Sequence, residues 1–100
     1  MYTSRRRWQV LVKLTKVDMV NNEPTINRVF LNPQHVISII EDNLKYHELK
    51  EGLIKAGVHQ QLSVSEVKVY NGSSVETMLI MGSPSTIREK LTSNRQILRG

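Results

Sequence analysis

Residues 29–40, Val-Phe-Leu-Asn-Pro-Gln-His-Val-Ile-Ser-Ile-Ile, predict two β-strands joined by a tight turn. A β-branched and aromatic run leads into Asn32 and Pro33, and an almost wholly apolar run follows. Pro33 lacks the N–H that a sheet ladder needs, and it keeps Asn32 out of the helical region of backbone space. The segment therefore fixes one corner of a β-sheet but supplies no reactive group.

The strand pattern extends toward the N-terminus. Apolar and more polar residues alternate from Trp8 to Leu14, which predicts a half-buried strand over about residues 7–17. The turn cluster at 21–24, Asn-Asn-Glu-Pro, ends this strand and places a second one at 25–31. The third strand, 36–40, is apolar on both faces, so we expect it in the centre of the sheet or in an oligomer interface.

The block at 43–61 has a different character. Leu49, Leu53 and Ala56 follow one another at helical spacing in a stretch rich in Leu, Lys and Glu. This predicts either a weakly amphipathic helix of three turns or a charged excursion between strands. Gly52 counts against the helix, and Gly57 is a suitable stop for one.

The C-terminal part predicts a hairpin followed by a helix. Two alternating runs, 64–70 and 75–81, flank Asn-Gly-Ser-Ser at 71–74, and Asn-Gly between such runs is a strong hairpin signal. Ser83 suits a helix N-cap and Pro84 a first helical residue, with Ile87, Leu91 and Leu98 as the residues that would face the sheet. The expected fold is therefore α+β, a small, mostly antiparallel five-stranded sheet with a C-terminal helix and a short helical insertion. We expect a single domain over 1–100, with a basic N-terminal tail at 1–6 and a charged insertion at 43–61.

These motifs, in this order, resemble a known family. Lys-Leu-Thr-Lys at 13–16, the run from Val29 through Leu-Asn-Pro to Glu41, and Val-Lys-Val-Tyr-Asn-Gly at 67–72 are similar to segments of the small flagellar and swarming proteins of the FlbD type. The helix segment Ser-Thr-Ile-Arg-Glu-Lys-Leu at 85–91 completes the likeness. The resemblance implies this strand order and no site residue. The same layout also suits a bacteriophage-encoded accessory protein.

Composition narrows the class of protein. A 100-residue chain makes one small core, so dimerisation would help it to hide apolar surface. The chain has no cysteine and no apolar run near the roughly 20 residues that span a bilayer, so we expect a cytoplasmic protein without membrane insertion. The three histidines, at 35, 47 and 59, lack the spacing of a helical metal site. No Ser-centred nucleophile motif or acid–base pair stands out, so we expect no enzyme, metal or cofactor.

The basic residues gather at the two ends of the chain. Residues 1–16 hold five basic residues and no acid, and residues 67–100 hold five basic residues against two acids. Guanidinium groups bind phosphates in a bidentate manner, and an indole can stack on a base. If the two ends meet in space, they would form one positive face. The candidate contacts to an anion or a nucleic acid are Arg5, Arg6, Arg7, Trp8, Lys13, Arg88, Arg95 and Arg99.

Two functions follow from these observations. The first is a non-enzymatic small regulatory or accessory protein that binds a protein partner and forms a homo-oligomer, with Val36, Ile37, Ile39 and Ile40 as its candidate oligomer interface. The second is a polyanion binder that holds nucleic acid or a nucleotide-like ligand on its basic termini.

Overall fold

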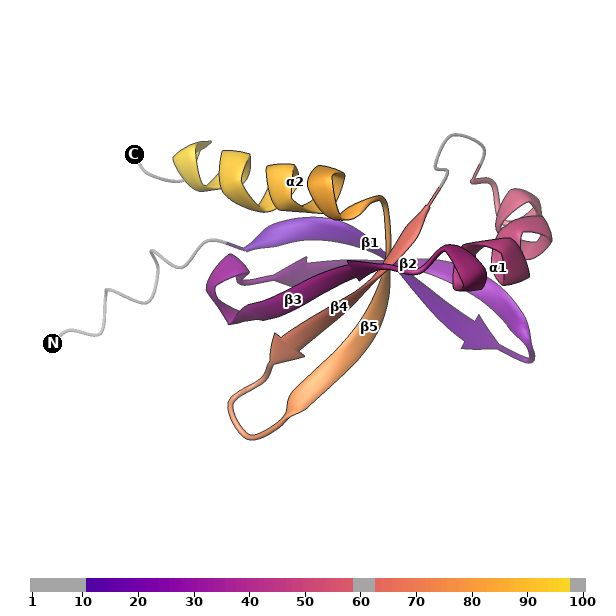
Figure 1. Cartoon of the computed structure of the whole chain (residues 1–100), viewed down its shortest axis with the longest axis horizontal. Coiled ribbons are helices and arrows are strands. Elements are labelled where there is room, and N and C mark those ends of the chain that lie inside the picture. Colours follow the sequence, from indigo (N-terminus) through magenta and orange to yellow (C-terminus); the bar gives the residue numbers. More distant parts are fainter. Residues whose placement is uncertain (1–10, 59–62, 98–100) are drawn as a thin grey trace, which may run out of the picture.

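The computed structural model describes residues 11–58 and 63–97, which form a five-stranded antiparallel sheet and two helices (Figure 1). This confirms the predicted α+β class, including the C-terminal helix and the helical insertion. The elements are β1 (Val12–Val20), β2 (Glu23–Leu31), the 3₁₀ turn η2 (Pro33–His35), β3 (Val36–Glu41), α1 (Asn43–Lys55), β4 (Val64–Tyr70), β5 (Val75–Met81) and α2 (Pro84–Ile97).

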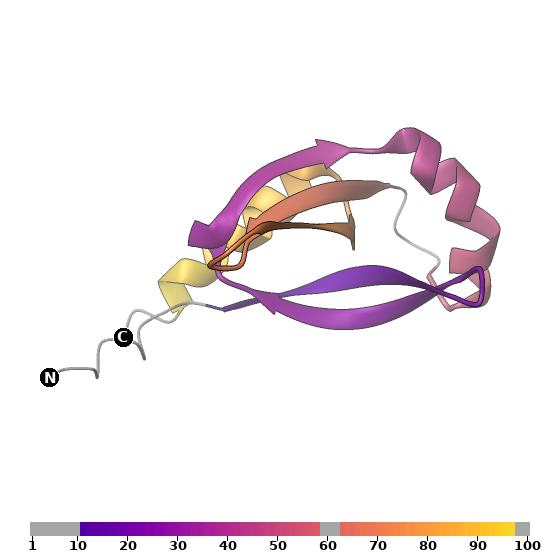
Figure 2. The same cartoon turned by 90° about the horizontal axis from the view of Figure 1, so that it is seen from below.

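The strand order is β2-β1-β5-β4-β3, so two strands that are consecutive in the chain lie at opposite edges of the sheet. Because only residues 32–35 separate β2 from β3, these two edges must come close at that end, and the sheet curls. Figure 2 shows β3 and the β1–β2 hairpin as opposite sides of this curled sheet. The ladder between β1 and β5 is short, since these strands share only the register pairs Lys16–Ile80 and Val17–Leu79.

Of the two positions predicted for the third strand, the centre of the sheet is wrong, because β3 is an edge strand, whereas the oligomer interface stays a prediction. Val36 and Ile39 pack against the core, whereas Ile37 and Ile40 are 55% and 56% exposed. A register irregularity between Val36 and Ser38 places Ile37 on the same side as Ile40. One apolar face of this strand therefore meets the core, and the other is exposed to solvent.

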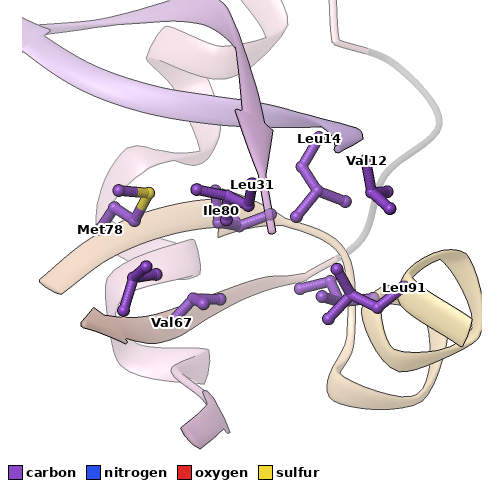
Figure 3. Packing of buried hydrophobic residues seen from close by; sticks show 9 residues of the cluster. Val12, Leu14, Leu31, Val67, Met78, Ile80 and Leu91 are labelled. Atoms are coloured by element: carbon purple, nitrogen blue, oxygen red, sulfur yellow. The ribbon is translucent and has the colours of Figure 1, made fainter. Parts of the chain in front are cut away.

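Two apolar clusters lie on opposite faces of the sheet. The inner face carries Val12, Leu14, Val67 and Ile80, together with Leu31 and Met78, and α2 covers it with Ile87 and Leu91 (Figure 3). The outer face carries a smaller cluster at one end only, where Leu49 and Leu53 of α1 pack against Val17, Val64 and Met81. Neither helix of the described residues packs a cluster of buried residues against the rest of the outer face. Ile87 and Leu91 face the sheet, as predicted. Leu98, the third residue predicted to do so, lies outside the described residues.

Capping interactions fix both ends of α1. The Asp42 carboxylate accepts a hydrogen bond from the backbone N–H of Lys45 at 3.0 Å. At the other end, Gly57 N–H bonds the Ile54 carbonyl and Val58 N–H bonds the Leu53 carbonyl, which is a Schellman ending with Gly57 at φ +98°. The predicted helix is thus confirmed with Gly57 as its stop. Ala56 is exposed because it is already the C-cap.

The two hairpins differ in their turns. Asn21 and Asn22 both have positive φ, 54° and 65°, as in a two-residue type I′ turn, so β1 runs on to Val20. Residues 7–10 of the predicted first strand lie outside the described residues. The second hairpin closes through four residues, in which the Asn71 side-chain oxygen accepts from Ser73 N–H and Ser74 N–H and Gly72 has φ +104°. Pro24 is tolerated within β2 because β2 is an edge strand.

The junction between β5 and α2 is anchored from both sides. Gly82 N–H donates to the Ser63 carbonyl, and the buried Ser65 hydroxyl donates to the Gly82 carbonyl, both at 2.8 Å. Ser83 then caps the helix, as predicted, because its hydroxyl accepts from the Thr86 N–H at 3.2 Å. The start of α2 is therefore held to β4 and to the loop before it. Among the helices in the described part of the chain, none is long and apolar enough to cross a membrane.

Candidate functional site

The predicted oligomer residues divide into two pairs. Val36 and Ile39 are half-buried against the inner core, so they stabilise the monomer. Ile37 and Ile40 lie on the outer face, where α1 does not reach them. Only the second pair is placed to touch another molecule.

Ile37 and Ile40 belong to a patch that spans three strands, which we call the β3–β5 face. One row pairs Tyr70 with Val75, the next sets Ile37 and Ser38 beside Lys68 and Thr77, and the third sets Ile40 beside Glu66. Tyr70 and Val75 are 46% and 52% exposed. Apolar side chains thus surround one cation and one anion on β4, the middle strand of these three. The β3–β5 face consists of Ile37, Ile40, Glu66, Lys68, Tyr70, Val75 and Thr77.

Lys68 and Glu66 are half-buried, and among the described residues neither lies within salt-bridge distance of an opposite charge. They sit two residues apart on β4 and therefore point to the same face. The β3–β5 face therefore carries one positive and one negative charge at its centre, and these two side chains form no salt bridge among the described residues.

The predicted basic contacts are not all brought together. Arg5, Arg6, Arg7, Trp8 and Arg99 lie outside the described residues. Lys13 is exposed on β1, on the face opposite to Val12 and Leu14, so it points away from α2. Arg88 is exposed on α2, and Arg95 lies two turns further along the same helix. Lys13 and Arg88 are therefore on different sides of the sheet. The elements that carry them, β1 and α2, do pack together, because Val12 and Leu91 belong to one core cluster.

A second surface, which we call the β1–β2 face, surrounds Lys13. The register pairs Lys13 with Phe30 and Thr15 with Arg28, so these four side chains share the outer face. Phe30 is 58% exposed, and Lys13 and Arg28 are exposed as well. Sequence reasoning missed Phe30 and Arg28. The signal was present, because a two-residue turn at Asn21 and Asn22 fixes this register from the sequence alone.

An open cleft of about 430 Å³ is lined by residues of β1, β2, β4, β5 and the turn at 32–35. Phe30 and Tyr70 both line it, and its other apolar residues include Val29, Leu31 and Met78, which belong to the inner-face cluster or pack against it. Its charged or titratable side chains include Lys16, His35 and Glu76. The volume falls within the range of small-ligand sites, but the cleft is wide open and its charges are mixed.

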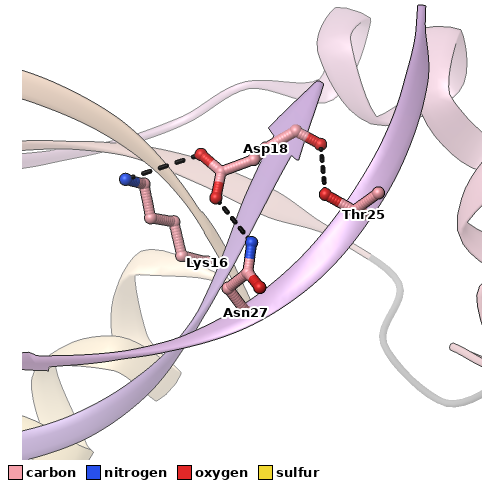
Figure 4. Close-up of polar contacts among 4 residues, drawn as sticks. All are labelled: Lys16, Asp18, Thr25 and Asn27. Carbon is pink, nitrogen blue, oxygen red and sulfur yellow. Dashed lines mark hydrogen bonds and ion pairs between the residues drawn. The ribbon is translucent and has the colours of Figure 1, made fainter. Parts of the chain in front are cut away.

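Hydrogen bonds and an ion pair join polar side chains of the β1–β2 hairpin (Figure 4). The Asp18 carboxylate accepts from the Asn27 amide at 2.7 Å and lies 3.5 Å from Lys16 Nζ, and the Thr25 hydroxyl donates to the Asp18 carbonyl at 3.1 Å. Both carboxylate oxygens of Asp18 are thus engaged within the hairpin. This network links β1 and β2 next to the residues of β1 that pair with β5.

A further cleft, of about 450 Å³, separates the tip of the β1–β2 hairpin from α1. Lys45 and Glu48 line it and form an exposed ion pair at 2.9 Å. The hydrogen bond from Lys45 to the Glu48 carboxylate, together with their mutual attraction, raises the pKa of Lys45 above its usual value. In residues 11–58 and 63–97, no group of three or more His, Cys, Asp or Glu side chains is placed to hold a metal ion.

No protein-family model, curated protein or solved structure matches this chain. The resemblance to the FlbD type, and to a phage accessory protein, therefore stays a hypothesis that rests on the strand motifs. The two surfaces that bear on function in the described part of the chain are the β3–β5 face and the β1–β2 face.

Proposed function

We propose that this chain is a non-enzymatic accessory protein of the cytoplasm that acts through protein–protein contacts and assembles with a second copy of itself through the β3–β5 face. The observation that carries the proposal is the set of four exposed apolar side chains on three adjacent strands, Ile37, Ile40, Tyr70 and Val75. A contiguous apolar surface of this kind is typical of an interaction site, whereas single exposed apolar residues are not.

Charge favours a second copy as the occupant. In a two-fold dimer the same patch meets itself, so a residue i that contacts j is matched by j contacting i. A two-fold axis that lies in the interface, at right angles to β4 and between Glu66 and Lys68, would bring Lys68 of each copy toward Glu66 of the other. Both charges would then be satisfied inside an otherwise apolar interface, which a wholly acidic or wholly basic partner surface could not achieve.

The test is the mass in solution, measured by light scattering after size-exclusion chromatography. We expect a dimer, about twice the 11.5 kDa of one chain, at micromolar concentration. The double variant Ile37→Lys with Ile40→Lys should be monomeric yet folded, because both side chains are more than half exposed. The matched control is Val20→Lys, an equally exposed apolar residue at the tip of the β1–β2 hairpin, which should leave the dimer intact.

A charge exchange makes the test specific for two-fold contact. Lys68→Glu alone should weaken the dimer, because it places four acids at the interface. Lys68→Glu combined with Glu66→Lys should restore it, because each new Lys again meets a new Glu. A wild-type protein that stays monomeric at about 100 µM, a concentration at which weak dimers of this size class are populated, would reject the proposal.

A further inference from the structure

We propose that the β1–β2 face is a binding site for single-stranded nucleic acid, with Phe30 as the stacking platform and Lys13 and Arg28 as phosphate contacts. Lys13, Arg28 and Phe30 lie on β1 and β2, outside the β3–β5 face, so this inference does not depend on the proposed dimer, although Tyr70 lines the same cleft as Phe30.

Phe30 is the central residue of this site. It is the chain's one phenylalanine, and a ring of this size normally contributes to the core of a small domain. Here it is 58% exposed, because α1 covers the outer face only at the opposite end of β2, near Pro24. An exposed ring on a flat strand surface presents a π-face on which any base can stack.

Two cations flank the ring. Lys13 is directly opposite Phe30 in the β1–β2 ladder, and Arg28 lies two residues from Phe30 on the same strand and the same face. Because Arg28 pairs with Thr15, Lys13 and Arg28 are diagonal neighbours on the two strands, about 7–8 Å apart, which is comparable with the spacing of successive phosphates. Among the described residues neither cation forms a salt bridge, so both are free to bind phosphate.

The surroundings fit a flexible strand better than a duplex or a protein. Along β1 and β2, the outward positions from residue 11 to 19 and from 24 to 30 contain no acid, so nothing on these strands repels a phosphate backbone. Phe30 also lines the 430 Å³ cleft, which gives room for an unstacked base beside the ring. A duplex has its bases stacked internally and could offer neither the π-face nor the free base.

The experiment is fluorescence anisotropy of a labelled 20-residue oligothymidylate with the full chain, at several salt concentrations. Phe30→Ala should weaken binding by roughly 5- to 100-fold at fixed salt, as expected for loss of one stacked base, and leave the slope of log K against log salt unchanged. Lys13→Ala with Arg28→Ala should flatten that slope by about 1.4, because each single-strand phosphate contact contributes about 0.7. Phe30→Trp should keep the affinity.

Matched controls separate this site from general charge and apolar effects. Lys50→Ala removes an exposed cation from α1, and Leu44→Ala removes an exposed apolar residue from the same helix, so neither should change binding. A duplex of the same sequence should bind more weakly than the single strand. Absence of binding at about 50 mM salt, where phosphate contacts are strongest, would overturn the proposal. Equal affinities of wild type and both site variants would overturn it as well, since the oligonucleotide would then bind elsewhere.

Discussion

Replacement of Gly52 by Ala tests how α1 is seated on the β1–β2 hairpin. Gly52 is in the interior of α1, where Ala normally stabilises a helix by about 1 kcal/mol relative to Gly. In this structure a Cβ atom at position 52 would lie 2.5 Å from both Cγ and Cδ of Pro24. These ring atoms are tied to the β2 backbone and cannot rotate away, so either α1 or the hairpin has to move.

The two effects oppose each other, and their sizes decide the outcome. Overpacking costs about 1–3 kcal/mol, and a contact more than 1 Å inside normal van der Waals distance belongs in the upper half of that range. After the helix gain is subtracted, we expect Gly52→Ala to lower the free energy of unfolding by about 1–2 kcal/mol. For a chain of this length that corresponds to a fall of roughly 5–15 °C in the melting temperature.

Urea and thermal denaturation followed by circular dichroism would measure the change. A double-mutant cycle with Pro24→Ala isolates the contact, because without the proline ring the same Gly52→Ala change should stabilise the protein by up to about 1 kcal/mol. If Gly52→Ala is as stable as the wild type while Pro24 is present, α1 does not rest on Pro24 and the reasoning is refuted.

Three smaller changes probe other parts of the fold by the same denaturation assays. Gly72→Val should destabilise the chain by about 1 kcal/mol or more, because a β-branched residue is strained at φ +104°, and an unchanged melting temperature would contradict this. Ser83→Ala should cost about 1 kcal/mol through loss of the α2 cap, whereas Ser83→Asp should keep most of the stability. Ser65→Ala should cost about 1–3 kcal/mol, because it leaves the buried Gly82 carbonyl without the hydroxyl donor, and a neutral result would mean that another donor replaces it.

Local sequence signals predicted the elements well. Alternation identified the strands, and the predicted roles of Ser83 and Gly57 at helix ends are found in the structure. Gly52 looked like an argument against α1 because helix propensity was the only visible consideration. The structure supplies the reason for a glycine there, since Pro24 occupies the space that a side chain would need. That contact joins segments far apart in the sequence, so no local pattern could reveal it.

Strand order and the candidate surfaces were harder to predict. The apolar run of β3 suggested a central strand, but periodicity cannot tell whether an apolar face meets the core, a partner or solvent. The charge count drew attention to the chain ends, whereas Phe30 and Arg28 depend on cross-strand register. That register follows from Asn21 and Asn22, whose short polar side chains tolerate the left-handed conformation, so this part of the β1–β2 face was within reach of sequence reasoning.

The narrow contact between β1 and β5 has a consequence for how quickly the chain folds. The β1–β2 hairpin and the β4–β5 hairpin, with β3 beside it, can form from neighbouring segments, whereas Lys16 and Ile80 are roughly 60 positions apart. The turn at 32–35 joins the two formed halves, and the sheet then pairs residues far apart in the chain in return for two register pairs, so this step should come late. α2, which follows all five strands of the sheet, contacts both β1 and β3 and would help to hold the halves together once they meet. A growing chain that lacks α2 would therefore join its two halves without the contacts of α2, through the two register pairs and the packing of α1 against Val17.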